Sequence, residues 1–97
     1  MTPQGAKQKP RKIRQREYDL FRQYGISLSF YDDLFSVQFG KCKICNLETP
    51  GKPLHVDHCH TTGKVRGLLC TTCNRGLGHF KDNITNLEKA ILYLKGD

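Results

Sequence analysis

The sequence has no tryptophan, a single methionine and no long run of apolar residues. Only 37% of its 97 residues are hydrophobic, so we expect one domain with a modest core that needs additional stabilisation. A membrane-spanning helix requires about 20 consecutive apolar residues, and no stretch approaches that length. The first twelve residues also lack the apolar segment of a secretory signal peptide. These absences predict a cytoplasmic protein with no membrane partner.

Acidic residues are also scarce, with nine Asp and Glu against sixteen Lys and Arg, so the formal net charge is +7. Seven of the basic residues lie in residues 1–22 and nine in residues 41–97, whereas residues 23–40 contain none. Positive charge on both sides of a small domain indicates a polyanionic partner, and nucleic acid is the simplest candidate. A purely solubilising role is the alternative explanation of this charge.

Two parts of the chain differ in composition. Residues 1–12 combine proline and glycine with four Lys and Arg and offer almost nothing to bury, which predicts a flexible basic arm. The apolar periodicity begins at Ile13, so residues 13–97 form the single predicted folded domain. We expect the arm to lie along the phosphate groups of a nucleic acid, with a solvated tail as the alternative.

Helical periodicity occurs in three segments outside the cysteine-rich centre of the chain. Apolar residues recur on one face over residues 13–24 and again over residues 30–39, where Ser29 resembles a helix-capping residue. The aromatic residues of the second segment are assigned to the core. A last helix is expected after Asn83, a suitable N-cap, and its apolar residues predict that it packs back onto the other helices.

The centre of the chain has strand and turn signals. Residues 54–58 and 64–69 are predicted to be two strands joined by a turn over residues 61–63. A short helix is expected over residues 74–78, weakened and ended by its two glycines. The hairpin and the helices together predict a small α+β fold.

Four cysteines occur as two Cys-x2-Cys pairs separated by 24 residues, namely Cys42, Cys45, Cys70 and Cys73. Four thiolates at tetrahedral reach select one Zn²⁺ and leave no open coordination position, so this site is predicted to be structural. An iron–sulfur centre or two disulfides are the alternatives. With zinc bound to four thiolates, the net charge falls to about +5. Cys59 is interpreted as a half-buried thiol outside the metal site.

Asp57, His58 and Asn74 offer the groups that phosphodiester hydrolysis requires. A carboxylate and an amide oxygen suit Mg²⁺ or Mn²⁺, and an imidazole can deprotonate water near neutral pH. Neighbouring residues of a regular strand point to opposite faces, so Asp57 and His58 can act together only if the strand ends or is distorted there. A lone Asp-His pair is more commonly structural. The catalytic interpretation depends on the hairpin, the cysteine pairs and the asparagine occurring together.

The run LHVDHCHTTGKVRGLLCTTCNRGLGHF, preceded by CKIC, resembles the recombination endonuclease VII family, a branch of the HNH or His-Me finger nucleases found widely in bacteriophages. The resemblance implies a zinc-stabilised ββα-metal core with flanking N- and C-terminal helices. It implies that Asp57 and Asn74 bind the catalytic divalent metal and that His58 is the general base. It also implies that the four paired cysteines bind zinc and that His60 contacts the substrate or its phosphate.

The predicted function is metal-dependent hydrolysis of duplex or branched DNA, with one structural Zn²⁺ and one catalytic Mg²⁺ or Mn²⁺, leaving a 5′-phosphate and a 3′-hydroxyl. The candidate DNA-contacting residues are Arg66, Arg75, Lys64, Lys12, Arg14 and Arg16. The helix after Cys73 is expected to approach the minor groove.

The resemblance also bears on partners, location and rival functions. A homodimer and phage-encoded proteins are further candidate partners beside DNA, and the host cytoplasm is the expected location for a phage-encoded chain. One alternative function is a zinc-binding module that binds nucleic acid without cutting it. Another is a phage accessory protein that uses this fold for protein contacts.

Overall fold

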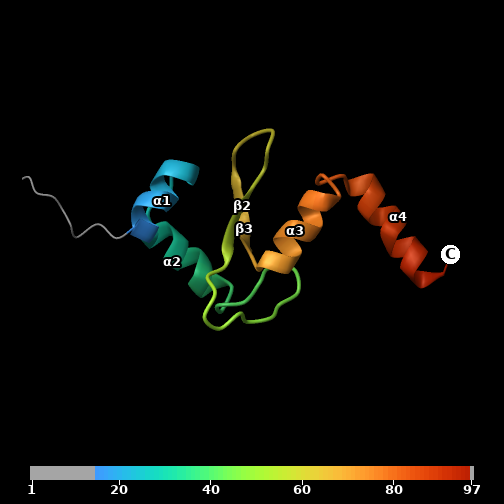
Figure 1. The fold of residues 1–97 in the computed structure, drawn as a ribbon, viewed down its shortest axis with the longest axis horizontal. Coiled ribbons are helices and arrows are strands. Elements are labelled where there is room, and N and C mark those ends of the chain that lie inside the picture. The colour runs from blue at the N-terminus through green and yellow to red at the C-terminus, as the bar shows by residue number, and fades with distance from the viewer. Residues whose placement is uncertain (1–14, 97) are drawn as a thin grey trace, which may run out of the picture.

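The structure, a computed structural model, describes residues 15–96. Its elements are, in chain order, α1 (Gln15–Tyr24), α2 (Leu28–Val37), β2 (His55–His58), β3 (Val65–Leu69), α3 (Thr71–His79) and α4 (Ile84–Lys95). The two strands form one antiparallel sheet, which stands between α1 and α2 on one side and α3 on the other (Figure 1). This arrangement confirms the predicted small α+β fold. None of the helices described over residues 15–96 is long and apolar enough to cross a membrane.

The first predicted helix corresponds to α1. Its predicted residues 13 and 14 lie outside the described residues, as does the predicted basic arm over residues 1–12. Gly25 follows the helix with a left-handed backbone (φ 70°), and its amide donates to the Phe21 carbonyl at 2.9 Å. Gly25 therefore ends α1 directly after Tyr24.

α2 begins two residues before the predicted helix over residues 30–39. Its N-cap is Ser27, whose Oγ accepts a hydrogen bond from the Phe30 amide at 3.0 Å. The prediction of Ser29 as the cap is wrong. Both serines suit a cap, and only the position of the preceding turn in the fold decides between them. Phe39 and Gly40 close the helix with left-handed backbones (φ 56° and 69°).

The core lies between α1, α2 and the hairpin and includes two of the paired cysteines. Its buried residues are Leu20, Ile26, Tyr31, Cys42, Leu54, Val56, Leu68, Leu69 and Cys70. The Tyr31 hydroxyl donates to the Leu54 carbonyl at 2.6 Å, which connects α2 to the segment before β2. A buried carbonyl thereby keeps its hydrogen bond.

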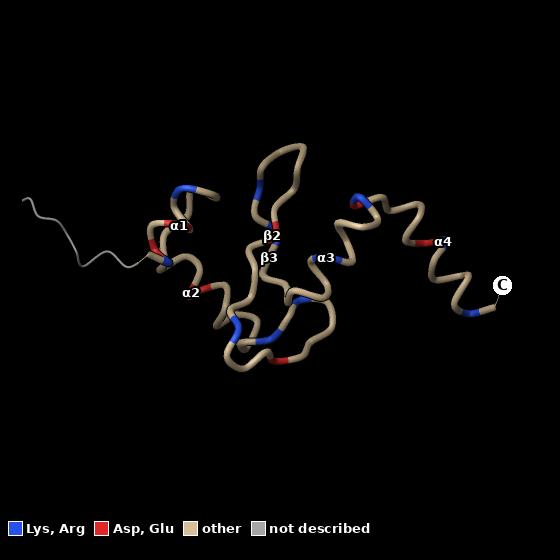
Figure 2. The backbone as a smooth tube through the Cα atoms, viewed as in Figure 1, with Lys and Arg blue, Asp and Glu red and all other residues tan. Residues whose placement is uncertain are grey.

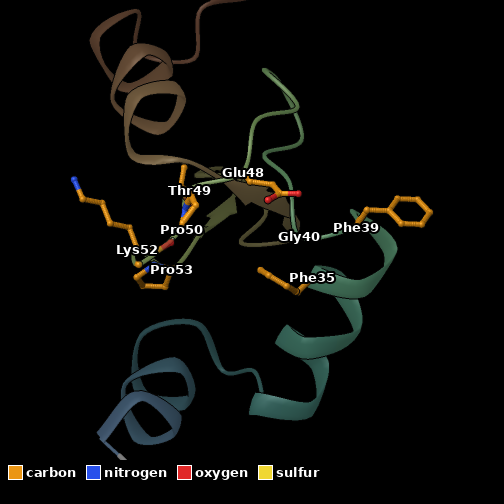
Figure 3. A pocket seen from close by; sticks show the side chains of 9 residues that line it. Phe35, Phe39, Gly40, Glu48, Thr49, Pro50, Lys52 and Pro53 are labelled. Atoms are coloured by element: carbon orange, nitrogen blue, oxygen red, sulfur yellow. Dashed lines mark hydrogen bonds between the residues drawn. The ribbon is translucent and has the colours of Figure 1, made fainter.

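The prediction that the whole aromatic stripe of α2 is core is wrong. Tyr31 is buried, but Phe35 is 42% exposed and Phe39 is 83% exposed. Neither Phe35 nor Phe39 belongs to the core cluster or packs against it. Phe35 and Phe39 instead line a hollow of about 560 Å³ against the loop over residues 48–53 (Figure 3).

Gln38 fixes the end of α2 to β3. Its side-chain amide donates to the Leu68 carbonyl at 3.0 Å, and its Oε1 accepts from the Leu68 amide at 2.9 Å. The pair of bonds imitates a neighbouring strand on the open edge of the hairpin. A Cβ on Gly67 would lie 3.2 Å from the Gln38 Oε1, so the glycine leaves room for this contact.

α3 is longer than predicted. The helix expected over residues 74–78 starts at Thr71, because Cys70 is its N-cap and the Cys70 sulfur accepts a hydrogen bond from the Cys73 amide at 3.4 Å. The second Cys-x2-Cys pair is thus the first turn of the helix. Gly76 and Gly78 lie inside α3 and do not end it.

The prediction that the last helix packs back onto the others is wrong. Asn83 caps α4 as expected, with its Oδ1 accepting from the Asn86 amide at 2.8 Å. However, α4 buries no side chain among the described residues, and Leu94 is 82% exposed. Lys81 and Asp82 both adopt left-handed backbones (φ 55° and 56°), and after this turn α4 extends away from the hairpin (Figure 1).

Candidate active site and metal centre

The four paired cysteines come together in one cluster. The sulfur atoms of Cys42, Cys45, Cys70 and Cys73 all lie within 4.8 Å of one another, and the Cys45 and Cys70 sulfurs are 3.8 Å apart. Tetrahedral zinc with bonds of about 2.3 Å requires sulfurs roughly 3.8 Å apart. All five cysteines are free of disulfides, and Cys59 is not part of this cluster. The cluster therefore fits one tetrahedral zinc ion.

The electrostatics of this cluster also favour a cation. Burial raises the pKa of Cys73 to about 12, and hydrogen bonding to the neighbouring sulfurs adds to the rise. Burial acts in the same direction on Cys42, but backbone amides, including that of Ile44 at 3.4 Å, outweigh it and lower the Cys42 pKa to about 6. Four closely spaced thiols cannot all ionise unaided, so a divalent cation is needed to hold them as thiolates.

A β-bulge distorts the hairpin between Asp57 and His58, where joint action of these two residues requires a distortion. Asp57 pairs with Gly67 and His58 pairs with Val65, so Arg66 is an extra residue without a partner on β2. A bulge bends the strand and redirects side chains. The distortion falls between Asp57 and His58, and β2 ends at His58. The condition for these two residues to act together is met.

The Asp57 carboxylate is held by Arg66. The Arg66 Nε donates to the Asp57 Oδ2 at 2.7 Å and the Arg66 Nη2 donates to the Asp57 Oδ1 at 3.0 Å. The Asp57 side chain is only 14% exposed, so its charge requires a counter-ion. This pairing with Asp57 raises the pKa of the Arg66 guanidinium above its ordinary value. The predicted metal ligand is thus a half-buried carboxylate in contact with a cation.

Asp82, which the sequence did not indicate as a site residue, connects His60 to Arg66. The Arg66 Nη2 also donates to the Asp82 Oδ2 at 3.1 Å, and the His60 Nε2 lies 3.8 Å from that same oxygen. The His60 and His58 ring centroids are 4.9 Å apart. A continuous series of contacts, which we call the His58–Asp57 network, therefore runs from His58 through His60, Asp82 and Arg66 to Asp57.

Asp82 was not singled out from the sequence. It directly precedes the N-cap Asn83, where an acidic residue is favourable for the positive end of the helix. Nothing in the sequence pattern indicates that the turn after α3 directs Asp82 to the hairpin. The pairing of Arg66 with two carboxylates depends on that turn.

The His58 ring is also supported from α1. Its centroid lies 5.7 Å from that of the Tyr24 ring, with the planes inclined by 59°. His58 is half-buried, whereas the His60 side chain is 76% exposed. His58 is therefore the more firmly positioned of the two imidazoles, and His60 is the one open to a ligand.

Asn74 and Asp57 lie on two elements that contact each other, α3 and β2. The His55 Nε2 and Thr71 Oγ1 are 2.9 Å apart and set the register between these elements. Asp57 is two residues after His55 on the same strand face, and Asn74 is one helical turn after Thr71 on the same helix face. The Asn74 side chain is half-buried and has no hydrogen-bond partner within residues 15–96. Its amide oxygen is therefore free to bind a ligand.

The profile of the recombination endonuclease VII family matches residues 17–96. The chain belongs to the recombination endonuclease VII family. The match begins within α1, covers all the later elements and confirms the resemblance drawn from the central motif.

Curated relatives of this endonuclease VII family chain come from two bacteriophages. The Gene 59 protein of Mycobacterium phage D29 is 44% identical over 81 residues, which are 81% of this chain and 49% of the relative. The Gene 59 protein of Mycobacterium phage L5 is 44% identical over 80 residues, which are 80% of this chain and 49% of the relative. The chain thus spans about half the length of the curated relatives it matches.

A solved structure shares the fold. The crystal structure of the β-β-α-Me type II restriction endonuclease Hpy99I superposes with a TM-score of 0.57 at 32% identity, covering 87% of this chain and 42% of that chain. The predicted ββα-metal core with flanking helices is therefore confirmed at the level of the fold.

The basic residues of this endonuclease VII family chain lie on several elements. Figure 2 shows Lys and Arg on the hairpin, on α3 and on the turn before α4. Lys64 and Arg75 are exposed, whereas the Arg16 guanidinium lies 4.5 Å from the Tyr31 ring centroid in a cation–π contact. Lys12 and Arg14 lie outside the described residues. Arg66 belongs to the His58–Asp57 network, which already accounts for its charge.

Proposed function

We propose that this chain is a metal-dependent DNA endonuclease that hydrolyses phosphodiester bonds in duplex or branched DNA. The single observation that carries the proposal is the His58–Asp57 network, which brings an imidazole and a half-buried carboxylate together at the bulged end of the hairpin. Membership of the recombination endonuclease VII family and the likeness to a restriction endonuclease support the same reaction class.

Asp57 and Asn74 would hold one Mg²⁺ or Mn²⁺. Carboxylate and amide oxygens are the ligands that these hard cations prefer. The residues fit this role because the half-buried Asp57 carboxylate requires a positive counter-charge and the half-buried Asn74 amide lacks a hydrogen-bond partner within the described residues. When bound, the ion supplies positive charge to the scissile phosphate and to the leaving 3′ oxygen.

His58 acts as the general base in this proposal. Its imidazole accepts a proton from the attacking water, a new bond forms between that water oxygen and phosphorus, and the bond from phosphorus to the 3′ oxygen breaks. The leaving 3′ oxygen takes up a proton from solvent water. The products are a 5′-phosphate and a 3′-hydroxyl. The Tyr24 ring limits the orientation of the His58 ring, and the exposed His60 contacts a phosphate oxygen.

DNA binding in this proposal depends on the exposed charges around the network. Arg75 on α3 and Lys64 just before β3 bind the sugar–phosphate backbone, with α3 at the minor groove. Lys12, Arg14 and Arg16 extend the contact along the backbone, although Arg16 is also stacked on Tyr31. Contacts of this kind give affinity more than sequence specificity. The mycobacteriophage origin of the relatives supports action in the host cytoplasm.

A plasmid-nicking assay tests the proposal. Supercoiled plasmid is incubated in Mg²⁺ or Mn²⁺ with wild type, His58→Ala and the matched control His79→Ala, which removes an exposed histidine from α3. Each protein first has its zinc content verified as one ion per chain. We expect wild type and His79→Ala to nick alike and His58→Ala to lose at least about 100-fold in rate, as expected for a general base. Equal nicking by His58→Ala, or no nicking by zinc-loaded wild type, would contradict the proposal.

The chemistry of the ends and the substrate are tested separately. DNA ligase seals a nick only when a 5′-phosphate faces a 3′-hydroxyl, so complete resealing is the expected result. Nicks that resist the ligase would exclude the proposed direction of bond cleavage. A panel of linear, nicked and four-way-junction duplexes then ranks substrates by cleavage rate.

The exposed aromatic residues favour a second candidate function, contact with another protein. Phe39 and Tyr93 are 83% and 81% exposed, and burying such large rings against a partner would be favourable. The partner would be a second copy of this chain or another phage-encoded protein. Sedimentation equilibrium at increasing concentration, comparing wild type with Tyr93→Ser, tests the first of these. A monomer at every concentration would exclude the homodimer.

A further inference from the structure

We propose that Asp82 is a positioning residue: it accepts the Arg66 guanidinium and so releases the Asp57 carboxylate for the divalent metal ion. The inference rests on the proposed function, because it concerns how the predicted metal ligand becomes available. Neither the sequence pattern nor the family comparison assigns a role to Asp82.

The geometry places one guanidinium between two carboxylates. The Arg66 Nη2 is 3.0 Å from the Asp57 Oδ1 and 3.1 Å from the Asp82 Oδ2. The second bond to Asp57, from the Arg66 Nε, is 2.7 Å long. Arg66 therefore already contacts both acids, and a small rotation of its planar head is sufficient to move it from one to the other.

Arg66 and a divalent metal ion would compete for the Asp57 carboxylate. A guanidinium that binds both Asp57 oxygens occupies the ligand atoms that a metal ion needs, and the two cations repel each other at short range. Metal binding at Asp57 therefore requires Arg66 to withdraw. Asp82, whose side chain is 25% exposed, offers the departing guanidinium a second carboxylate, so the positive charge is not left unpaired.

The backbone directs Asp82 into this position. Lys81 and Asp82 have left-handed φ values of 55° and 56°, and the Asp82 amide donates to the Leu77 carbonyl at 2.9 Å, which closes α3. Asparagine tolerates a left-handed backbone as readily as aspartate does. Asp82→Asn therefore keeps the turn and the size of the side chain and removes only the charge, which makes it the informative variant.

The space around Arg66 permits the movement. Arg66 lines two hollows, one of about 230 Å³ shared with Asp57 and Leu77 and one of about 470 Å³ shared with His60 and Asp82. The guanidinium lies at the boundary between them and can shift toward the second without displacing a buried side chain. His60 also lines that second hollow, so the withdrawn Arg66 would lie beside the imidazole that is proposed to contact a phosphate oxygen.

Binding of Mn²⁺ alone, measured by calorimetry on zinc-loaded protein without DNA, tests the inference. We expect Asp82→Asn to weaken Mn²⁺ binding about tenfold, because Arg66 then remains on Asp57. Arg66→Gln removes the competitor and should bind Mn²⁺ at least as tightly as wild type. The double variant should equal Arg66→Gln, because Asp82 acts only through Arg66. Glu88→Gln, an exposed charge change on α4, is the matched control and should equal wild type.

Several outcomes would overturn the inference. Unchanged Mn²⁺ affinity in Asp82→Asn would show that Asp82 does not act on Asp57. An equal loss with and without Arg66 would make Asp82 a direct or long-range contributor to metal binding. Absence of Mn²⁺ binding in wild type and Arg66→Gln alike would also refute it. The plasmid-nicking assay tests the role of His58, so it can support the proposed function even when the Mn²⁺ titrations refute the role of Asp82. Circular dichroism on every variant detects any loss of folding.

Discussion

The hairpin with its cysteine cluster and the last helix have equally clear apolar patterns, but only the hairpin region buries its apolar side chains. Leu54 and Leu68 in the hairpin region are 1% and 0% exposed, whereas Ile91 and Leu94 in α4 are 52% and 82% exposed. Periodicity predicts that an element forms and which face is apolar. It does not supply the surface that covers this face.

The two regions are ordered by different kinds of contact. The centre is held by long-range contacts, namely the gathered sulfurs, the Gln38 bonds to Leu68 and the Tyr31 bond to Leu54. α4 is held by its own ends, with Asn83 as the N-cap and Gly96 as a left-handed C-cap (φ 88°). Local caps can define a helix that makes almost no tertiary contact, although such a helix is marginal alone.

The largest expected effect comes from breaking the cysteine cluster. Cys70→Ser removes a predicted zinc ligand and alters the N-cap of α3 at once, so we expect loss of zinc and loss of cooperative thermal unfolding. The binding free energy of a structural zinc is on the order of 10 kcal/mol, which exceeds what a small core supplies. Zinc analysis and a calorimetric melt measure both. Cys59→Ser is the control and should keep one zinc. A zinc-free Cys70→Ser protein with the wild-type melt would refute the structural role.

The next largest effect should come from the core beside the cluster. Leu68→Ala leaves a cavity at a fully buried position and should lower the free energy of unfolding by about 2–5 kcal/mol, measured in urea. Leu47→Ala, at a leucine that is 64% exposed, is the matched control with the same chemical change. Similar losses for both would mean that burial does not separate these positions.

The smallest effect is expected in α4. Leu94→Gln replaces an exposed leucine by a good helix former and should change the free energy of unfolding by less than about 0.5 kcal/mol. The same urea titration measures it, repeated at several protein concentrations. A loss above about 1 kcal/mol that grows with protein concentration would place α4 in an interface between copies. The apolar face of α4 would then be buried, as that of the hairpin is.

Part of the candidate site could be predicted from the spacing of residues that lie close together in the sequence. The spacing of Cys42, Cys45, Cys70 and Cys73 predicted a cluster, because a hairpin between two pairs returns the second pair to the first. The demand that β2 be distorted between Asp57 and His58 was also met. In both cases local geometry leaves few alternatives, so a pattern of residue types is sufficient.

The remainder of the site required contacts that no local pattern encodes. Arg66 was predicted to meet phosphate, and the structure pairs it with Asp57 because a single extra residue in β3 changes the register. Asp82 was overlooked because nothing in the sequence pattern indicates its contact with Arg66. The roles of His58, His60 and Asn74 stay predictions.

The sequence by itself determined that four sulfurs meet, that a hairpin connects them and that helices form on either side, because these follow from spacing, caps and turn residues within short stretches. Only the tertiary structure decided which apolar faces are covered, which acid joins Arg66 and where α4 lies. Those outcomes depend on two left-handed residues and one bulge, whose small local changes redirect everything that follows them in space.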